Sequence, residues 1–184
     1  FQGEVRYKKP VGIYWLQAAA VETASALGLP RAQIRIWLYR VPSLIGAIGA
    51  VLLTYLAALA FVTRRGAVLA GLIMCGSVLL GVEARLAKTD AMLLLTIVGA
   101  MGALARIYLS SRRGENPEHP SWTHPAIFLT AIAGGILLKG PLILMFVGLT
   151  IGAVAILDRS ASWLWRLRSV WGLMWVLVLV MPWF

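Results

Sequence analysis

Long apolar runs, separated by short charged or Gly/Pro-containing connections, make up most of the chain. The first run, residues 41–62, has no charged side chain over about 22 residues, enough at ~1.5 Å per residue to cross a hydrocarbon core of ~30 Å. Comparable runs follow at 67–82, 91–109, 126–138, 141–157 and 170–181. We therefore expect an all-α, polytopic transmembrane helical bundle of about six spans.

The run 126–138 is short for a span, since ~10–14 apolar residues fit a buried helix equally well. It becomes long enough if Trp122 and Lys139 anchor its two ends at the membrane interfaces. We include it among the spans on that basis.

The first 40 residues are more polar than the rest. A helix is expected over 11–28, but Gln17 and Glu22 make it too polar for a span, and Tyr14 and Trp15 suit the headgroup zone. Residues 1–40 are thus predicted to form an extramembrane loop with a juxtamembrane amphipathic helix, and 41–184 the transmembrane region. Because the chain starts in a polar segment and stops after an apolar run, we expect an internal fragment of a larger membrane domain.

Composition supports this class of protein. Hydrophobic residues make up 60% of the 184 residues and charged residues 13%, against about 25% charged in soluble domains. In a soluble domain, the formal net charge of +10 would suggest a nucleic-acid-binding function. Here the basic residues lie between apolar runs, where they set topology and contact membrane lipids, so we expect no nucleic-acid partner.

Alternating spans place every second connection on the same membrane face. The connection 83–90, the break at 139–141 and the C-terminal end should therefore share the face of residues 1–40. The opposite face carries seven arginines: Arg64, Arg65, Arg112, Arg113, Arg159, Arg166 and Arg168. The positive-inside rule makes that face cytoplasmic. Residues 1–40 also carry six basic residues, so either the orientation is inverted or these cations have a function on the outer face.

Three charged strings gather on the predicted outer face and suggest a site for a phosphate-bearing substrate. Lys9 precedes Pro10 at the start of a predicted helix, where an anion would offset both the lysine and the helix dipole. Lys139 lies at a helix break next to Gly140. Asp90 opens the third span.

Each of these residues also has a simpler explanation. The basic face around Lys9 would contact anionic headgroups, and Lys139 would extend its amine to the interface. Asp90 would be a helix N-cap, with Arg85 and Lys88 paired to it. Glu83 would pair with a nearby arginine.

Five strings occur in an order that is familiar from one family: Lys9 to Trp15, Arg40 to Leu44, Arg85 to Asp90, Leu138 to Pro141, and Pro182 to Phe184. With spans between them, they resemble the bacterial membrane glycosyltransferases related to protein O-mannosyltransferases, most closely the lipid A aminoarabinose transferase type. This resemblance implies a GT-C fold in the bacterial inner membrane with a periplasmic active site. Such enzymes move a sugar from a polyprenyl-phosphate carrier to a lipid, glycan or protein acceptor.

The resemblance also implies roles for individual residues. Lys9 and Lys139 would bind the donor phosphate and Asp90 would be catalytic, with support from three neighbours: Tyr7, Arg85 and Lys88. The family usually has an acidic residue before the Lys-Pro lysine, which contributes to a metal site in some members. Here that position is Lys8, so we expect no metal and no other cofactor. The family's general base lies upstream, with Glu4 the nearest candidate here, so this fragment alone is expected to be inactive.

Two other classes of function fit parts of the pattern. A secondary transporter for an anionic solute would use Lys139 at a helix break, but would place charges near the membrane midplane and show an inverted repeat. A scaffold subunit would be held by close helix packing at Gly46, Gly49, Gly134 and Gly135, which leaves the charged strings unexplained. The sequence does not identify the sugar or the acceptor.

Overall fold

The computed structural model describes residues 10–113, 122–167 and 169–181, and these are helical with no strand among them. The α-helices are α1 (Gly12–Ala26), α2 (Ile36–Ala58), α3 (Arg64–Cys75), α4 (Val78–Glu83), α5 (Asp90–Arg112), α6 (Thr123–Lys139), α7 (Leu142–Asp158) and α8 (Ser169–Val180). Two 3₁₀ turns, η1 (Ala32–Ile34) and η2 (Ser162–Leu167), lie in the connections. The predicted all-α class is confirmed.

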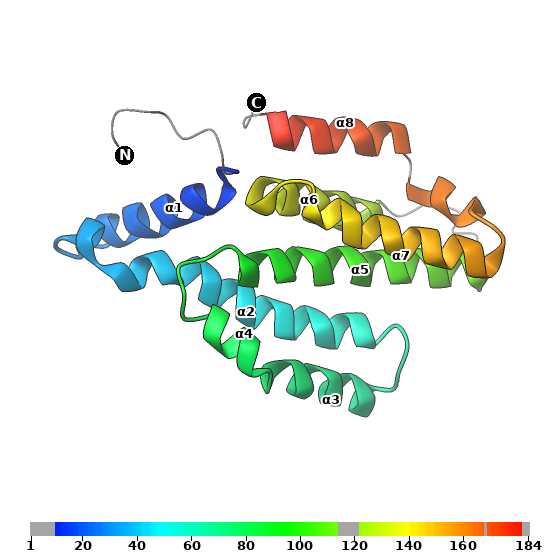
Figure 1. Cartoon of the computed structure of the whole chain (residues 1–184), viewed down its shortest axis with the longest axis horizontal. Helices are drawn as coiled ribbons and strands as arrows, with labels where there is room; N and C mark the ends of the chain where they lie inside the picture. Colours follow the sequence, from blue (N-terminus) through cyan, green and yellow to red (C-terminus); the bar gives the residue numbers. More distant parts are fainter. Residues whose placement is uncertain (1–9, 114–121, 168, 182–184) are drawn as a thin grey trace.

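The helices form a largely antiparallel array: the chain reverses direction between most successive helices, while α4 continues in the general direction of α3 (Figure 1). Helix α5 lies between α2 and α6 and makes its main contacts with both. Helix α8 packs on α6, and α3 packs on α2. Helix α1 contacts α2 and the end of α6, beside the start of α5 (Figure 1). Helices α2 and α5, each of 23 residues, are long and apolar enough to cross a membrane.

Small residues allow the central helices to approach closely. A Cβ added at Gly46 would lie 2.7 Å from the backbone nitrogen of Met92, so α2 and α5 touch backbone to backbone at this point. A Cβ added at Gly135 would lie 2.5 Å from the side chain of Ile143, at the contact of α6 with α7. The predicted use of these glycines for close helix packing is confirmed.

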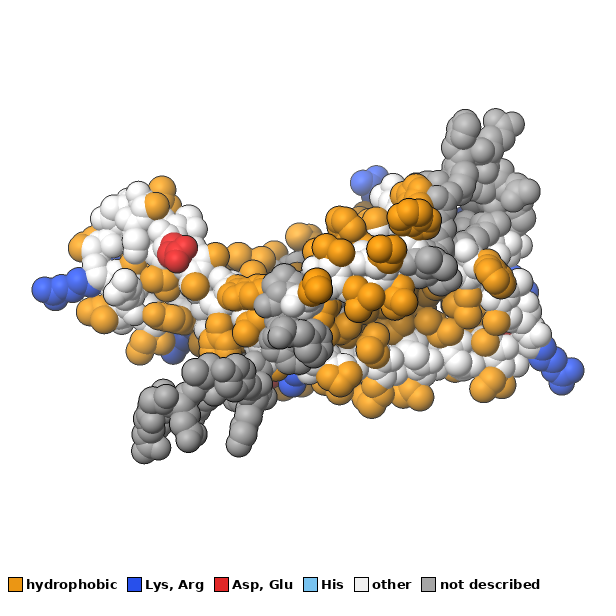
Figure 2. All heavy atoms as spheres, turned by 90° about the horizontal axis from the view of Figure 1, so that it is seen from above, with side chains coloured by type: hydrophobic (Ala, Val, Ile, Leu, Met, Phe, Trp, Pro, Cys, Tyr) orange, Lys and Arg blue, Asp and Glu red, His pale blue; other side chains and the backbone are white. Residues whose placement is uncertain are grey.

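Apolar side chains cover much of the outer surface. Helix α8 exposes Trp171, Leu173, Met174, Trp175, Leu177 and Val178, and Figure 2 shows apolar side chains spread over the face that contains this helix. Helices α2, α3 and α7 also expose large apolar side chains, for example Leu52 (58% exposed), Ile73 (76%) and Leu149 (67%). Water-soluble monomers rarely expose apolar patches of this extent. Such a surface is suited to a hydrocarbon environment, in agreement with the two helices that are long and apolar enough to cross a membrane.

Helix boundaries in the first two apolar runs differ from the sequence prediction. Helix α2 begins at Ile36 rather than near Val41, and Pro42 lies inside it. Proline lacks the N–H that would bond back to Leu38, but its position near the first turns limits the loss. The predicted continuous run 67–82 is broken into α3 and α4, and Ser77 caps the new helix by accepting a 3.4 Å hydrogen bond from the Leu80 amide.

Helices α5 and α6 extend beyond their apolar runs by including the charged residues that flank them. Helix α5 runs through Arg112, and α6 ends at Lys139. With 17 residues, α6 is longer than the apolar run that predicted it. The added residues are Thr123, His124 and Pro125 at the start of α6 and Lys139 at its end, where a basic residue interacts favourably with the helix dipole.

Candidate functional site

The amine of Lys139 donates a hydrogen bond to Oδ1 of Asp90 and forms an ion pair with it. Lys139 is the last residue of α6 and Asp90 is the first residue of α5, so the pair joins two helix ends. Each charge is favourably placed, because the N-terminus of a helix attracts anions and its C-terminus attracts cations. The side chains are 43% and 38% exposed, so both remain accessible from outside the bundle.

The simpler explanation of Asp90 as an N-cap is wrong. The N-cap position of α5 is Thr89, and its side chain makes no capping hydrogen bond. The pairing of Asp90 with Arg85 and Lys88 is also wrong: Lys88 instead forms an ion pair with Glu83 at 3.9 Å, and Arg85 is exposed. Glu83 therefore pairs with a lysine rather than with the expected arginine.

The connection between α4 and α5 is tied to the bundle by a buried serine. The hydroxyl of Ser43, on α2, donates a 2.9 Å hydrogen bond to the main-chain carbonyl of Lys88. Ser43 is fully buried, so this bond is shielded from competition with water. It restrains the backbone two residues before Asp90.

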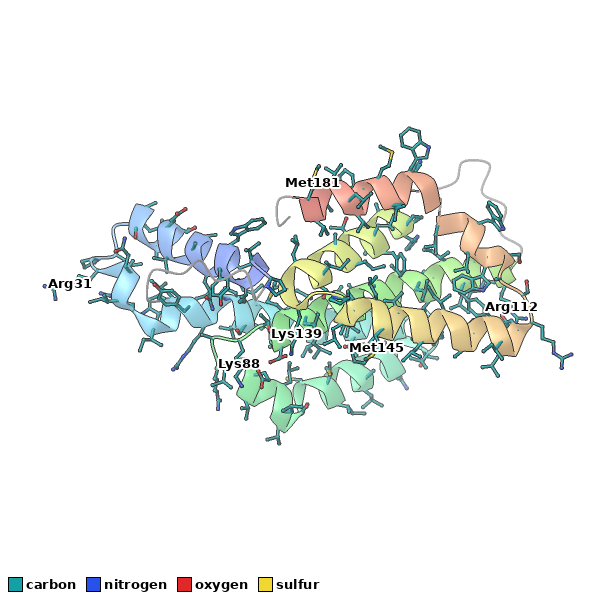
Figure 3. The ribbon with its side chains drawn as sticks, turned by 45° about the horizontal axis from the view of Figure 1, so that its top comes forward. Arg31, Lys88, Arg112, Lys139, Met145 and Met181 are labelled. Atoms are coloured by element: carbon teal, nitrogen blue, oxygen red, sulfur yellow. The ribbon has the colours of Figure 1, made fainter. Side chains whose placement is uncertain are left out.

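A cavity of about 420 Å³ adjoins the Asp90–Lys139 pair. Its walls come from the end of the charged connection that leads into α5, from the end of α6, and from α1 with the residue before it: Pro10, Ile13, Tyr14, Gln17, Ala87, Lys88, Thr89, Asp90, Leu138 and Lys139. Figure 3 shows Lys88 and Lys139 at the same end of the bundle, with Arg112 at the opposite end. The structure thus brings together the predicted site residues Lys88, Asp90 and Lys139, whereas Tyr7 and Lys9 lie outside the described residues.

Helix α1 reaches this cavity through a close contact with α6. A Cβ added at Gly12 would lie 2.7 Å from the carbonyl oxygen of Leu137, so the first turn of α1 rests directly on the last turn of α6. Sequence reasoning did not assign the α1 residues to the site. Their spacing was a usable signal, because Ile13, Tyr14 and Gln17 recur at helical intervals and form one face.

The cavity combines a cation with apolar walls. A lysine amine has three N–H donors, and one of them is used by Asp90. The remaining donors can bind a phosphate oxygen, while Ile13 and Leu138 provide apolar surface beside it. No three His, Cys, Asp or Glu side chains in the described ranges are grouped to hold a metal ion. The predicted absence of metal remains a prediction, since Glu4 lies outside those ranges.

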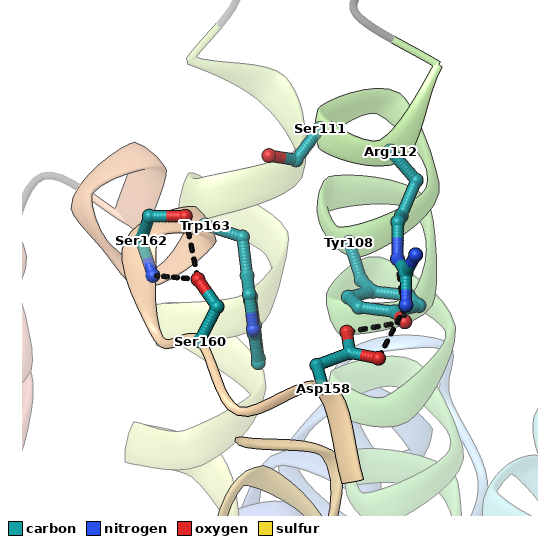
Figure 4. Close-up of a pocket in the computed structure, with 7 residues that line it drawn as sticks. All are labelled: Tyr108, Ser111, Arg112, Asp158, Ser160, Ser162 and Trp163. Atoms are coloured by element: carbon teal, nitrogen blue, oxygen red, sulfur yellow. Dashed lines mark hydrogen bonds and ion pairs between the residues drawn. The ribbon is translucent and has the colours of Figure 1, made fainter. Parts of the chain in front are cut away.

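A second polar cluster, at the opposite end of the bundle, was not predicted. Tyr108 donates a 2.6 Å hydrogen bond to Oδ2 of Asp158, and Arg112 Nε donates a 3.0 Å bond to the Tyr108 hydroxyl (Figure 4). Arg112 also forms an ion pair with Asp158. The ring of Trp163 packs edge-on against Tyr108 at 5.5 Å between centroids. Tyr108 and Arg112 are four residues apart on α5, which was the available signal.

This second cluster joins the C-terminal ends of α5 and α7, and it lines a cavity of about 310 Å³. Its charges are balanced within the cluster, because the carboxylate of Asp158 accepts hydrogen bonds from both Arg112 and Tyr108. Arg112 is held by both Nε and Nη2 within the cluster, because it also donates to the Tyr108 hydroxyl, whereas Lys139 keeps two N–H donors beyond its bond to Asp90. We therefore assign the cluster a structural role.

No protein-family model, curated protein or solved structure matches this chain. The function is therefore argued from the residues of the site and their geometry.

Proposed function

We propose that this chain forms part of a GT-C-like membrane glycosyltransferase that takes its sugar from a polyprenyl-phosphate carrier. In this proposal α2, α3 with α4, α5, α6, α7 and α8 are six passes through a bacterial inner membrane, and α1 lies at its periplasmic surface. The acceptor is a lipid, glycan or protein. The contact of Asp90 with Lys139 at one end of the bundle, and of Arg112 with Asp158 at the other, supports the alternating direction of these passes.

The observation that carries the proposal is the Asp90–Lys139 pair beside an apolar-walled cavity. A polyprenyl-phosphate sugar has an anionic phosphate diester between an apolar chain and a polar sugar. The cavity offers Lys139 to the phosphate, with the apolar side chains of Ile13 and Leu138 next to it. Helix α1, with Tyr14 and Trp15 exposed, is suited to the headgroup region where the carrier phosphate resides.

The chemistry proposed is displacement at the anomeric carbon of the sugar. The acceptor oxygen forms a bond to this carbon, and the bond from the carbon to the phosphate oxygen breaks with its electron pair moving to the leaving phosphate. Lys139 offsets the negative charge that develops on that phosphate. Asp90 holds the amine of Lys139 in place before the donor binds. The proton of the acceptor passes to a carboxylate, which acts as general base.

The position of the pair favours this proposal over transport of an anionic solute. Asp90 and Lys139 are terminal residues of their helices, whereas a transporter would place its binding charges near the middle of the spans. The cavity also opens beside α1, on the surface of the bundle, rather than between the helix centres.

The test is sugar transfer by membranes that contain the full-length protein. Polyprenyl-phosphate-linked aminoarabinose and mannose, carrying a label, serve as donors, and labelled acceptor is measured. We expect Lys9→Ala, Asp90→Asn and Lys139→Ala to abolish transfer at normal expression, while Arg64→Gln, at the opposite end of the bundle, remains active. Full activity in the three site variants would contradict the proposal.

A further inference from the structure

A third cavity, of about 330 Å³, lies at the end of the bundle opposite Asp90 and Lys139. It is bounded by the end of α2, the last turns of α5 and the first turn of α6. Its lining consists of Leu59, Ala60, Arg106, Leu109, Ser110, Arg113 and His124. Two arginines and a histidine thus face one space, and no carboxylate accompanies them in the described lining. This distinguishes the cavity from the neighbouring cluster, where Asp158 neutralises Arg112.

The guanidinium of Arg106 is held in place without losing its charge. Its Nη2 donates a 2.5 Å hydrogen bond to the carbonyl oxygen of Leu56. In a continuing helix the Ala60 amide would bond to that carbonyl, but it bonds instead to Ala57, because α2 ends here. Arg106 therefore caps the end of α2. A neutral carbonyl orients a guanidinium but does not compensate its positive charge, so an anion in the cavity is favoured.

We propose that this cavity binds the phosphate group of an anionic phospholipid. Basic pockets between transmembrane helices are suited to such headgroups. An apolar stripe leads away from the cavity at Leu59, because Leu52 and Leu56 on α2 and Leu59, its C-cap, lie three or four residues apart and are 58%, 43% and 37% exposed. An acyl chain lies along this stripe while its headgroup phosphate contacts Arg106 and Arg113. Free phosphate is also an anion, but it has no acyl chain to lie along the stripe.

The test is lipid binding by the purified full-length protein in a neutral detergent, measured by native mass spectrometry. Phosphatidylglycerol and phosphatidylcholine with identical acyl chains are titrated, and glycerol 3-phosphate is added as a soluble competitor. We expect tighter binding of phosphatidylglycerol and no displacement by an equal concentration of glycerol 3-phosphate. Arg113→Gln should weaken phosphatidylglycerol binding about fivefold, whereas Arg113→Lys should largely retain it.

Arg113 is the better position for substitution because Arg106 also caps α2. The matched control is Arg65→Gln, which removes a cation at the same end of the bundle but away from the cavity. Equal binding of the two lipids, or equal effects of Arg113→Gln and Arg65→Gln, would overturn the proposal. Efficient displacement by glycerol 3-phosphate would also overturn it, in favour of a soluble phosphate ligand. Sugar transfer is not measured, so this result is independent of the proposed enzymatic function.

Discussion

The fully buried hydroxyl of Ser43 donates a 2.9 Å hydrogen bond to the main-chain carbonyl of Lys88, and this bond links α2 to the connection that leads into Asp90. The backbone of the candidate site is thus positioned by a residue of a different helix. The site residues themselves lie at helix ends, where side chains are partly exposed. The geometry of the candidate site therefore depends on buried contacts, such as that of Ser43, beneath the partly exposed site residues.

Replacing this serine should loosen the site. We expect Ser43→Ala to cost about 1 kcal/mol of stability, because the Lys88 carbonyl loses its partner, and to reduce sugar transfer. Thermal unfolding in detergent and transfer in membranes measure the two effects. Thr54→Ala is the matched control, since Thr54 bonds only to the Ala50 carbonyl of its own helix. Equal activity of the two variants would show that the connection needs no such restraint.

The Asp90–Lys139 pair should matter more for activity than for stability. A half-exposed ion pair contributes less than about 1 kcal/mol, so Asp90→Ala and Lys139→Ala should unfold close to the wild-type temperature. Transfer should fall about 100-fold or more in each, because the leaving phosphate loses its cation or the cation loses its orientation. Exchanging the two residues, Asp90→Lys with Lys139→Asp, should restore the pair but not transfer. Recovery of transfer in the exchanged variant would reduce the pair to a structural contact.

A side chain at Gly12 should displace α1 from α6. The added Cβ of Gly12→Ala would lie 2.7 Å from the Leu137 carbonyl oxygen, so the first turn of α1 must move and the cavity must change shape. We expect reduced transfer with an increased KM for the donor, measured by steady-state kinetics. Gly148→Ala, where a Cβ meets nothing within 4 Å, should be active. Wild-type kinetics for Gly12→Ala would exclude α1 from the donor site.

Replacing Gly46 by a residue with a side chain should disrupt the packing of α2 against α5. A Cβ there would lie within 2.8 Å of the Ala91 and Met92 backbones, which cannot rotate away as a flexible side chain can. We expect Gly46→Ala to destabilise the bundle by about 1–3 kcal/mol, measured by thermal unfolding in detergent. Gly152→Ala, in open space on α7, serves as the comparison. An unchanged unfolding temperature for Gly46→Ala would contradict the close helix contact.

The cluster at the other end of the bundle should behave as a structural contact only. We expect Tyr108→Phe to lower the unfolding temperature, because Asp158 loses a hydrogen bond and Arg112 loses an acceptor. Transfer per folded molecule should remain at the wild-type level, since the cluster lies at the end opposite Lys139 (Figure 3). Tyr55→Phe provides a comparison on α2. Loss of transfer at normal folding would give the cluster a role in the reaction.

Much of the helical organisation was predictable because apolar run length is a local property. The runs 91–109 and 141–157 correspond to α5 and α7 within a few residues. The break at Ser77 was not predicted. A serine within an apolar run can either lie inside one continuous helix or cap the start of a new one, and tertiary packing decides between these two structures. The end of α6 at Lys139 followed from the Gly140-Pro141 break, since glycine there adopts a positive φ of 70°.

By itself, the sequence determined which segments are helical and apolar and which charged residues lie at the same end of an alternating bundle. These properties depend on hydrophobicity and on the direction of successive helices, both of which are encoded locally. Only the tertiary structure decided that Lys139 pairs with Asp90, that Lys88 pairs with Glu83, and that α1 borders the cavity. Asp90 and Lys139 are 49 residues apart, and their contact depends on the rotation and offset of α5 against α6. That register is set by interhelical packing of small and large side chains, which a local pattern does not specify.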